Sequence, residues 1–507
     1  MYDIAVIGAG MAGMATAARL QAAGLQTLVL EAHGLPGGCA GYFRRSGFAF
    51  DVGATTLVDF EPNGVGGELL RTIGMPPLDG EVLPGYVGWL PDRTVTLHRD
   101  HALWESERLR ALGDTPAHRD LWAFFDELAS VFWTASRRGV KLPIRSLADA
   151  LSAAKALGLR HLPLARYLSW TVGDALRARG LQDDAPLRAL LSMLIEDTVH
   201  GTLDQAPLLN GVLGATIRGA GLTRARGGMY GFWRRFTAHY RRTGGELRVG
   251  TTVTAIRGTE GDFTVETSRG PFRAHRIVSA LPAQLTARIG PAEVREALAP
   301  FLRRDRDAVG GALVVFLGVP EEEVTGVPWT HHQLLQSYDA PLGDGNNMFI
   351  SVSAPGDTES APAGHRAVMI STHCELAPWE GLTDEAYARS KREAGERLVG
   401  LARRVYPNLG SAPQIHRVGT PRTYERFTRR LRGAVGGFRL SQKNANQNAI
   451  PHDIGMRGFW LCGDTTWPGL GTVACVLGSR IVATSVLGGR AEQAYFRPSL
   501  SEASHGA

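Results

Sequence analysis

Residues 3–24 read DIAVIGAGMAGMATAARLQAAG, and this stretch decides the fold of the N-terminal part of the chain. An apolar run leads into a glycine-rich turn and then into an alanine-rich run, which predicts a strand, a tight turn and a helix. The next apolar run, LQTLVLE, ends at Glu31 and predicts a second strand. This order is that of a βαβ unit, so we expect a parallel sheet.

Three glycines in the turn have separate tasks. Gly8 permits the sharp turn, Gly10 lets the backbone approach a pyrophosphate, and Gly13 lets the helix pack closely on the strand. The N-terminus of the helix then faces the phosphates. Glu31, about twenty residues further on, suits ribose hydroxyls and disfavours a 2′-phosphate. Together these features predict a dinucleotide site.

Two further glycine-rich runs extend this prediction to a long cofactor. Residues 36–41 read PGGCAG and residues 50–54 read FDVGA, and both offer backbone that can line a second face of the ligand. Residues 463–473 read GDTTWPGLGTV and predict a loop that leads into a helix. Asp464 suits ribityl hydroxyls, and the amides from Gly471 to Val473 suit negative charge on a reduced flavin ring.

The length of 507 residues suggests two joined domains, and the composition is that of an ordinary globular protein, with 44% hydrophobic and 21% charged residues. No apolar run reaches eighteen residues, and the first strand begins without a charged and apolar leader. We therefore expect neither a transmembrane helix nor a secretion signal.

Charge and cysteine usage exclude several classes. The four cysteines form no CxxC motif, which argues against a disulfide framework or a zinc site and favours a reducing, cytoplasmic compartment. The histidines also lack metal-ligand spacing with carboxylates, so we predict no metal. The net charge of +6 comes from arginine, since the chain has only four lysines, and it gives little support for a nucleic-acid partner.

The order of the remaining segments predicts interleaved domains. Residues 116–220 have a helical pattern, strands return from 244 to 282, and a mixed pattern follows from about 310, with a helix from Thr383 to Arg404. We predict a Rossmann-like α/β FAD-binding domain, similar to that of glutathione reductase, interleaved with a mixed α+β substrate domain that has a helical membrane-facing part. The predicted boundaries are 1–75, 225–290 and 450–489 for the first domain, 76–224 and 291–449 for the second, and 490–507 for a disordered tail.

With these motifs assembled, the chain resembles the phytoene desaturase-like family of FAD enzymes, which includes carotenoid desaturases, carotenoid isomerases and retinol saturases. The likeness extends over nearly the whole chain. It rests on VIGAGMAG at 6–13, RGGMYGFWRRF at 226–236, GGELRVGTTVTAI at 244–256 and LCGDTTWPGLGT at 461–472. Within the family, HHQLL at 331, NMFISVSAP at 347, APAGHRAVMISTH at 361 and residues 419–437 look most like the carotenoid 3,4-desaturase subgroup.

The resemblance implies FAD as the cofactor and a set of contacts for it. In the set given next, the residues up to Val253 would meet its adenosine diphosphate part, and those from Asp464 onward would meet its flavin part. The implied cofactor-binding residues are Gly8, Gly10, Met11, Ala12, Gly13, Glu31, Gly38, Cys39 and Val253, followed by Asp464, Gly471, Thr472 and Val473. Many relatives carry arginine or serine where this chain has Cys39, which puts a charged phosphate contact there in doubt. A small space-filling role for Cys39 is favoured over a redox thiol.

The resemblance also implies the reaction. A hydride leaves an allylic carbon of a polyene and a proton leaves its neighbour, which adds a double bond, here at C-3,4 of an acyclic 1-hydroxylated carotenoid. A strong base is not required, and the catalytic residues stay unknown, with Asp197, His200 and Glu425 as weak candidates beside Glu196. No second GxGxxG motif is complete, so oxygen or a quinone is the expected electron acceptor.

A carotenoid is held in the bilayer, so we expect a peripheral membrane contact. The aromatic stretch at 121–133, followed by Arg137, Arg138 and Lys141, would meet lipid head groups, and a second such stretch is LGLRHLPLARYLSW at 157–170. The alternative is that the aromatic side chains pack in the core of the substrate domain. The oligomeric state is not predicted.

Other functions remain open at this stage. On the same fold, a carotenoid cis–trans isomerase or a polyene saturase would use the flavin in its reduced form. From another class, the chain would be a non-catalytic flavin-bearing carotenoid-binding protein. An amine oxidase would want a flavin-facing lysine, and the scarcity of lysine counts against it.

Overall fold

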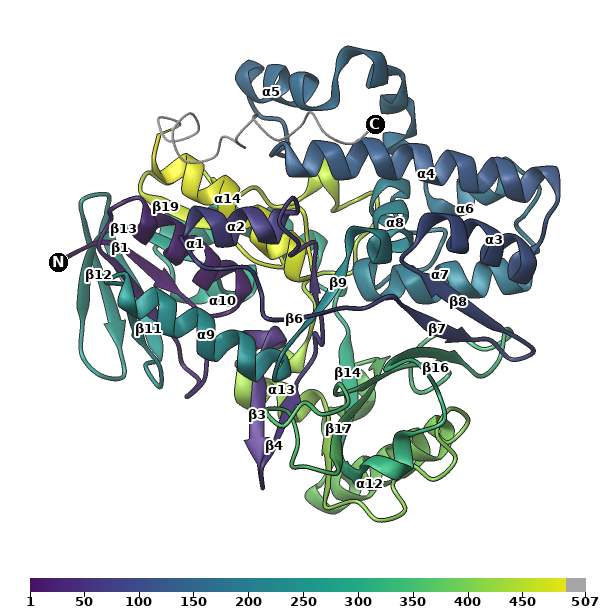
Figure 1. The fold of residues 1–507 in the computed structure, drawn as a ribbon. Coiled ribbons are helices and arrows are strands. Elements are labelled where there is room, and N and C mark those ends of the chain that lie inside the picture. Colours follow the sequence, from purple (N-terminus) through teal and green to yellow (C-terminus); the bar gives the residue numbers. More distant parts are fainter. Residues whose placement is uncertain (489–507) are drawn as a thin grey trace.

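The computed structural model describes residues 1–488, with all their side chains except those at positions 159, 160, 162 and 218. Figure 1 shows three parts: a half that contains the predicted dinucleotide turn, here called the nucleotide-binding half, a helical cap and a second sheet. The tail predicted at 490–507 lies outside the described residues.

The first half is built on a seven-stranded sheet with the order β10-β2-β1-β13-β12-β11, in which β19 also pairs with β13. β1 is parallel to β2 and β13, and β13 is parallel to β19, as the βαβ pattern predicts. The strands are β1 (Tyr2–Ile7), β2 (Thr27–Leu30), β10 (Glu246–Arg248), β11 (Val253–Thr259), β12 (Asp262–Thr267), β13 (Phe272–Ser279) and β19 (Phe459–Leu461).

Helices cover this sheet, and the small side chains of α1 allow close packing. α1 packs directly against α14, although the two are more than 400 residues apart in sequence. Both helices share one buried core. The helices of this half are α1 (Met11–Ala22), α2 (Val65–Thr72), α9 (Gly228–Arg242), α10 (Ala283–Ile289), α11 (Ala292–Arg304) and α14 (Thr472–Val486).

The second half contains a mixed seven-stranded sheet with the order β18-β14-β17-β16-β15-β7-β8, and α12 packs against it. Its apolar runs, such as ALVVFLGVP, are buried on both faces. Its elements are β7 (Gly85–Trp89), β8 (Thr94–His98), β14 (Gly311–Pro320), β15 (His331–Leu335), β16 (Asn347–Val352), β17 (His365–Cys374), β18 (Ile415–Gly419), α12 (Asp384–Ala402) and α13 (Pro421–Thr428).

Short strands connect the two halves. β3 pairs with β4, and Phe48 and Phe50 of β4 pack in a core with strands of the second sheet. β9 pairs with β5 and β6 in a small sheet between the halves. These strands are β3 (Tyr42–Arg45), β4 (Phe48–Asp51), β5 (Leu57–Val58), β6 (Gly80–Val82) and β9 (Leu222–Ala225).

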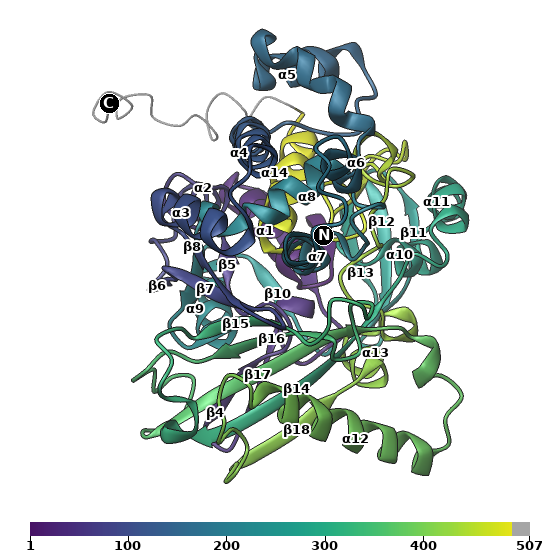
Figure 2. The ribbon, with the colours of Figure 1, turned by 90° about the vertical axis from the view of Figure 1, so that its right-hand side faces the viewer.

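Helices cap the second half, and α5 projects beyond α4 in both ribbon views (Figures 1 and 2). None of the described helices is long and apolar enough to cross a membrane. The cap consists of α3 (His101–Leu112), α4 (Pro116–Arg137), α5 (Leu147–Leu157), α6 (Val172–Arg177), α7 (Ala185–Val199) and α8 (Leu208–Ala215), with the 3-10 segments η2 (Leu159–Ser169) and η3 (Ile217–Ala220).

One expectation about the cap was wrong. The apolar side chains proposed to dip into a membrane belong to α4, and the structure buries most of them in the core of the cap. They pack there because α4 lies across α8 and α5, so its apolar stripe has protein partners. The buried side chains are Leu121, Phe124, Phe125, Leu128 and Val131, while Phe132 and Trp133 are partly buried against them.

Candidate functional site

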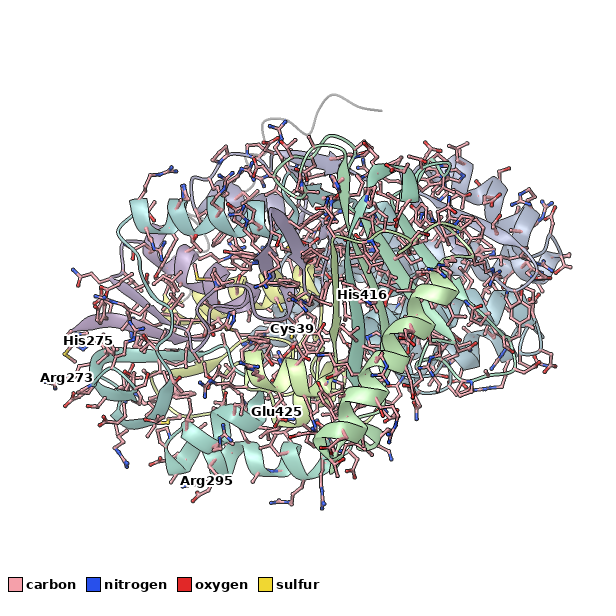
Figure 3. The ribbon with its side chains drawn as sticks, turned by 90° about the horizontal axis from the view of Figure 1, so that it is seen from below. Cys39, Arg273, His275, Arg295, His416 and Glu425 are labelled. Atoms are coloured by element: carbon pink, nitrogen blue, oxygen red, sulfur yellow. The ribbon has the colours of Figure 1, made fainter. Side chains whose placement is uncertain are left out.

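One cavity of about 990 Å³ runs between the nucleotide-binding half and the second sheet. All but one of the thirteen residues expected to bind the cofactor line it, and the exception is Gly13. Cys39 lies near the centre of the molecule, between the two halves (Figure 3). Segments from both ends of the chain, such as those around Gly8 and Gly471, therefore meet at one site.

The first glycine turn has the geometry that a pyrophosphate requires. Gly8 has a φ of +102°, and a Cβ at Gly13 would lie 2.0 Å from the carbonyl oxygen of Gly8. Gly13 is thus needed for packing of α1 on β1 rather than for contact with a ligand. A Cβ at Gly10, by contrast, would meet no protein atom within 4 Å, because Gly10 borders the cavity. This open space at the N-terminus of α1 fits a phosphate group.

Glu31 follows β2 and is held against the same turn. Its carboxylate accepts hydrogen bonds from the backbone amides of Ala9, at 2.8 Å, and His33, at 2.7 Å. Burial raises the pKa of Glu31, although these amides oppose the shift. The carboxylate borders the cavity, where its remaining lone pairs can accept from ribose hydroxyls.

The part of the cavity that is expected to hold the flavin contains a buried ion pair that the sequence did not indicate. Arg430 donates to Asp464 at 2.6 Å, and both side chains are largely buried. Burial alone would lower the pKa of Arg430, but the carboxylate of Asp464 outweighs it and raises the pKa. Burial also raises the pKa of the neighbouring Cys39 thiol, which favours the space-filling interpretation of this cysteine. Gly471 precedes α14, so the N-terminus of this helix faces the cavity as expected.

The other part of the cavity has apolar walls from the cap and the second sheet. It extends as far as Trp133 and Ser136 near the C-terminal end of α4 and Ile217 of η3. Its apolar wall also includes Tyr86, Met193, Leu194, Leu213, Leu222, Val314, Phe316, Met348 and Phe349. An apolar passage that joins a dinucleotide site suits an apolar substrate.

A group of polar side chains lies in this wall where α7 ends beside β15, β16 and β17. Of the weak catalytic candidates, Asp197 and His200 line the cavity there. Glu196 lies beside them and is buried. Glu425 is exposed on α13 and is not part of the cavity wall, so the structure does not bring it to the site (Figure 3). We call the group Glu196, Asp197, His200, Gln333, Asn347 and His373 the polar cluster.

Charge within the polar cluster is unevenly distributed. Burial raises the pKa of Asp197 to about 6. Burial opposes protonation of His373, but Glu196 and Asp197 outweigh it and raise the pKa of this histidine. The ring of His200 lies 4.2 Å from that of His373, and burial together with this neighbour lowers the pKa of His200 well below its usual value. His200 is therefore neutral at physiological pH.

Sequence reasoning missed Gln333, Asn347, His373 and Arg430. A signal existed for Gln333, because His331 and Gln333 are polar residues two positions apart in one strand, which places both on one face. For Arg430 no local pattern distinguishes it from its neighbouring arginines, since burial depends on contact with a residue 34 positions away.

The sequence of the chain was compared with those of known families and proteins. The family described as "Flavin containing amine oxidoreductase" matches residues 11–486. Prolycopene isomerase 1 of an Oncidium hybrid cultivar is 25% identical, over 93% of this chain and 81% of the isomerase. A lycopene-forming phytoene desaturase of Paracoccus sp. is 26% identical, over 95% of this chain and 96% of the desaturase.

Solved structures show the same fold. Putrescine oxidase bound to putrescine has a TM-score of 0.62 with 16% identity, covering 96% of this chain and 99% of that protein. Cyclohexylamine oxidase from Brevibacterium oxydans has a TM-score of 0.58 with 16% identity and the same coverage. Both likenesses are in fold alone.

Proposed function

The chain belongs to the flavin-containing amine oxidoreductase family, and we propose that within it the chain is an FAD-dependent desaturase of an acyclic, 1-hydroxylated carotenoid that adds a double bond at C-3,4. The observation that carries the proposal is the apolar passage that opens into the dinucleotide site. The near full-length similarity to carotenoid enzymes supports it. None of the four lysines is among the described residues that line the cavity, which counts against amine oxidation through a flavin-facing lysine.

FAD is the cofactor, and when bound it supplies an acceptor for a hydride. We assign its adenosine diphosphate part to Gly8, Gly10 and Glu31 with their neighbours, and its flavin part to Asp464 and the N-terminus of α14. The domain division at 1–75, 225–290 and 450–489 is kept as part of the proposal, since each strand of the first sheet falls in these segments. We extend its second segment to include α11, because Val294 and Leu298 of this helix pack in the core of the first sheet. Oxygen or a quinone would reoxidise the flavin.

His200 is the group we propose as proton acceptor. A Cβ at Gly436 would lie 2.3 Å from its Cε1, and one at Gly437 would lie 2.2 Å from the carbonyl oxygen of Asp464. The loop at 436–437 thus joins His200 to the flavin end of the cavity. A carbon next to a delocalised cation is strongly acidic, so a neutral imidazole with a low pKa is a sufficient base.

A cis–trans isomerase is the second candidate, and the likeness to prolycopene isomerases over 93% of the chain favours it equally. An isomerase leaves the mass of its substrate unchanged, whereas a desaturase removes two hydrogens and lengthens the chromophore.

The deciding experiment expresses the chain in a bacterium that makes an acyclic 1-hydroxycarotenoid. We expect a product two hydrogens lighter with absorbance at longer wavelength, and a His200→Gln variant with bound flavin but at least roughly tenfold lower turnover. A pigment of unchanged mass and altered retention would identify the isomerase. Bound flavin that no polyene reduces would instead indicate a non-catalytic carotenoid-binding protein.

Peripheral membrane contact is proposed at α5 and η2 rather than at α4. Leu147, Leu151 and Leu168 are exposed there, at 78%, 64% and 46%. Lys155 and Arg166 are exposed on the same segment. α5 packs against α4, whose end lines the cavity, so a lipid-bound substrate would have a short path to the site.

Replacing these leucines by aspartate should weaken membrane binding. We expect Leu147→Asp/Leu151→Asp to lower binding to anionic liposomes at least roughly tenfold, because two buried leucines contribute about 3 kcal/mol and the new charges repel the lipid. Co-sedimentation measures this. Leu103→Asp is the control, since Leu103 is 55% exposed on α3. Equal loss in the control and the double variant would contradict an α5 contact.

A further inference from the structure

The polar cluster places one carboxylate in a passage whose walls are largely apolar. Asp197 is the third residue from the C-terminal end of α7. Protein surrounds it, yet its side chain keeps exposed surface because it borders the cavity. The Nε2 group of Gln333 donates to its Oδ2 atom. Among the described residues no donor reaches Oδ1. Asp197 therefore presents a free acceptor to whatever fills the cavity.

Its neighbours have partners of their own. Asn347 donates to Oε2 of Glu196, while Nδ1 of His373 lies 3.6 Å from Oε1 of the same carboxylate. Glu196 is thus engaged on both oxygens and is buried. The side-chain nitrogen of Gln333 donates to Asp197, whereas its buried Oε1 atom has no partner among the described residues. Asp197 alone in this cluster combines a carboxylate with direct access to the cavity.

A hydrocarbon in this passage would remove water from Asp197 without replacing the lost hydrogen bonds. The uncompensated burial of a charged or polar group is costly, and a hydroxyl that donates to the carboxylate offsets that cost. The apolar walls on both sides fit a polyene, so the expected ligand is long and apolar with one hydroxyl.

We propose that Asp197 is a specificity residue that accepts a hydrogen bond from a hydroxyl group of the polyene substrate, with Gln333 as its positioning residue. The inference rests on the proposed function for the polyene and adds the group that selects it. The hydroxyl stays unchanged in the reaction, so no bond to it forms or breaks. An analogue without the hydroxyl would leave Asp197 buried without a partner, so we expect it to bind more weakly and to be turned over less efficiently.

The test uses the purified holoenzyme with two probes, an acyclic carotene that carries a tertiary hydroxyl at one end and its parent hydrocarbon. Turnover is followed as kcat/KM, and binding is followed separately by quenching of flavin fluorescence. We expect wild type to prefer the hydroxylated probe roughly 30-fold in both readouts. Asp197→Leu should abolish this preference while the kcat/KM for the hydrocarbon is retained or rises.

Asp197→Asn keeps a carbonyl acceptor and should retain part of the preference. Asp183→Asn, an exposed acid in the loop before α7, should leave both readouts unchanged. For Gln333→Met, the preference should fall, and the pH dependence of hydroxylated-probe binding should shift, since this variant removes a hydrogen bond that lowers the pKa of Asp197. A merely structural role would not move that pH profile.

Two outcomes would overturn the inference. One is equal loss of both probes in Asp197→Leu with flavin content preserved, which would make Asp197 a proton acceptor or a structural group. The other is a wild type that binds both probes with equal affinity. A wild type that turns over neither probe contradicts the proposed desaturation, but the binding preference still decides the role of Asp197.

Discussion

Gly13→Val protein is expected to emerge from purification without flavin. The Cβ of any side chain at this position would lie 2.0 Å from the carbonyl oxygen of Gly8 and 2.9 Å from the Cβ of Ala280. Backbone and buried neighbours cannot give way by that much, so α1 must move away from β1 and its N-terminus away from the phosphates. We expect FAD affinity to fall at least about 100-fold, or about 3 kcal/mol.

The measurement is the ratio of flavin absorbance to protein, followed by titration of the apoprotein with FAD. Gly34→Ala is the matched control, because its Cβ would meet no atom within 4 Å and its φ is not positive. If Gly13→Val does not fold, Gly10→Ala provides the test of the phosphate site instead. Its Cβ meets no protein atom, so the protein should fold normally and yet bind FAD more weakly. Full flavin occupancy in both Gly10→Ala and Gly13→Val would refute the phosphate assignment.

Removing one partner of the Arg430–Asp464 pair is expected to have the second largest effect. Arg430→Met leaves the Asp464 carboxylate buried without its cation, which should cost about 3 kcal/mol of stability. FAD affinity should fall as well, because both residues border the cofactor part of the cavity. Thermal unfolding of the apoprotein and FAD titration separate the two effects.

The double variant Arg430→Met/Asp464→Asn sharpens this test. It should recover stability, because no buried charge is left unpaired, but it should not recover FAD affinity, because both contacts are altered. Arg432→Met is the control, since Arg432 pairs with Glu380 where both side chains are over 40% exposed, and such surface pairs contribute little. A melting temperature for Arg430→Met equal to that of wild type would show that the pair is not important for stability.

Local sequence predicted the nucleotide-binding half well. The strand, turn and helix at 2–22 follow from hydrophobic periodicity and from steric demands of glycine, which act between near neighbours. The strand, loop and helix near the C-terminus were found in the same way, as was the helix around 384–402. The structure adds that these two ends of the chain meet, with α1 packed on α14.

The helical cap was predicted less well. The amphipathic pattern of α4 is equally consistent with a membrane surface and a protein core. An apolar stripe indicates only that one face of the helix avoids water, and it does not identify what covers that face. In the structure α4 packs on α8 and α5, so its apolar stripe lies in the protein core. The exposed leucines of α5, in contrast, stand in a segment whose pattern is weaker, so the sequence pointed first to α4.

The sequence by itself determined the dinucleotide fold and the family, because their motifs depend on backbone geometry within a few residues. Only the tertiary structure decided which polar residues share the cavity. Asp197, Gln333 and His373 come from a helix and two strands that are far apart in sequence. Their burial, and the pKa values of Asp197 and His373, depend on contacts that exist only once the sheet and the cap have packed together.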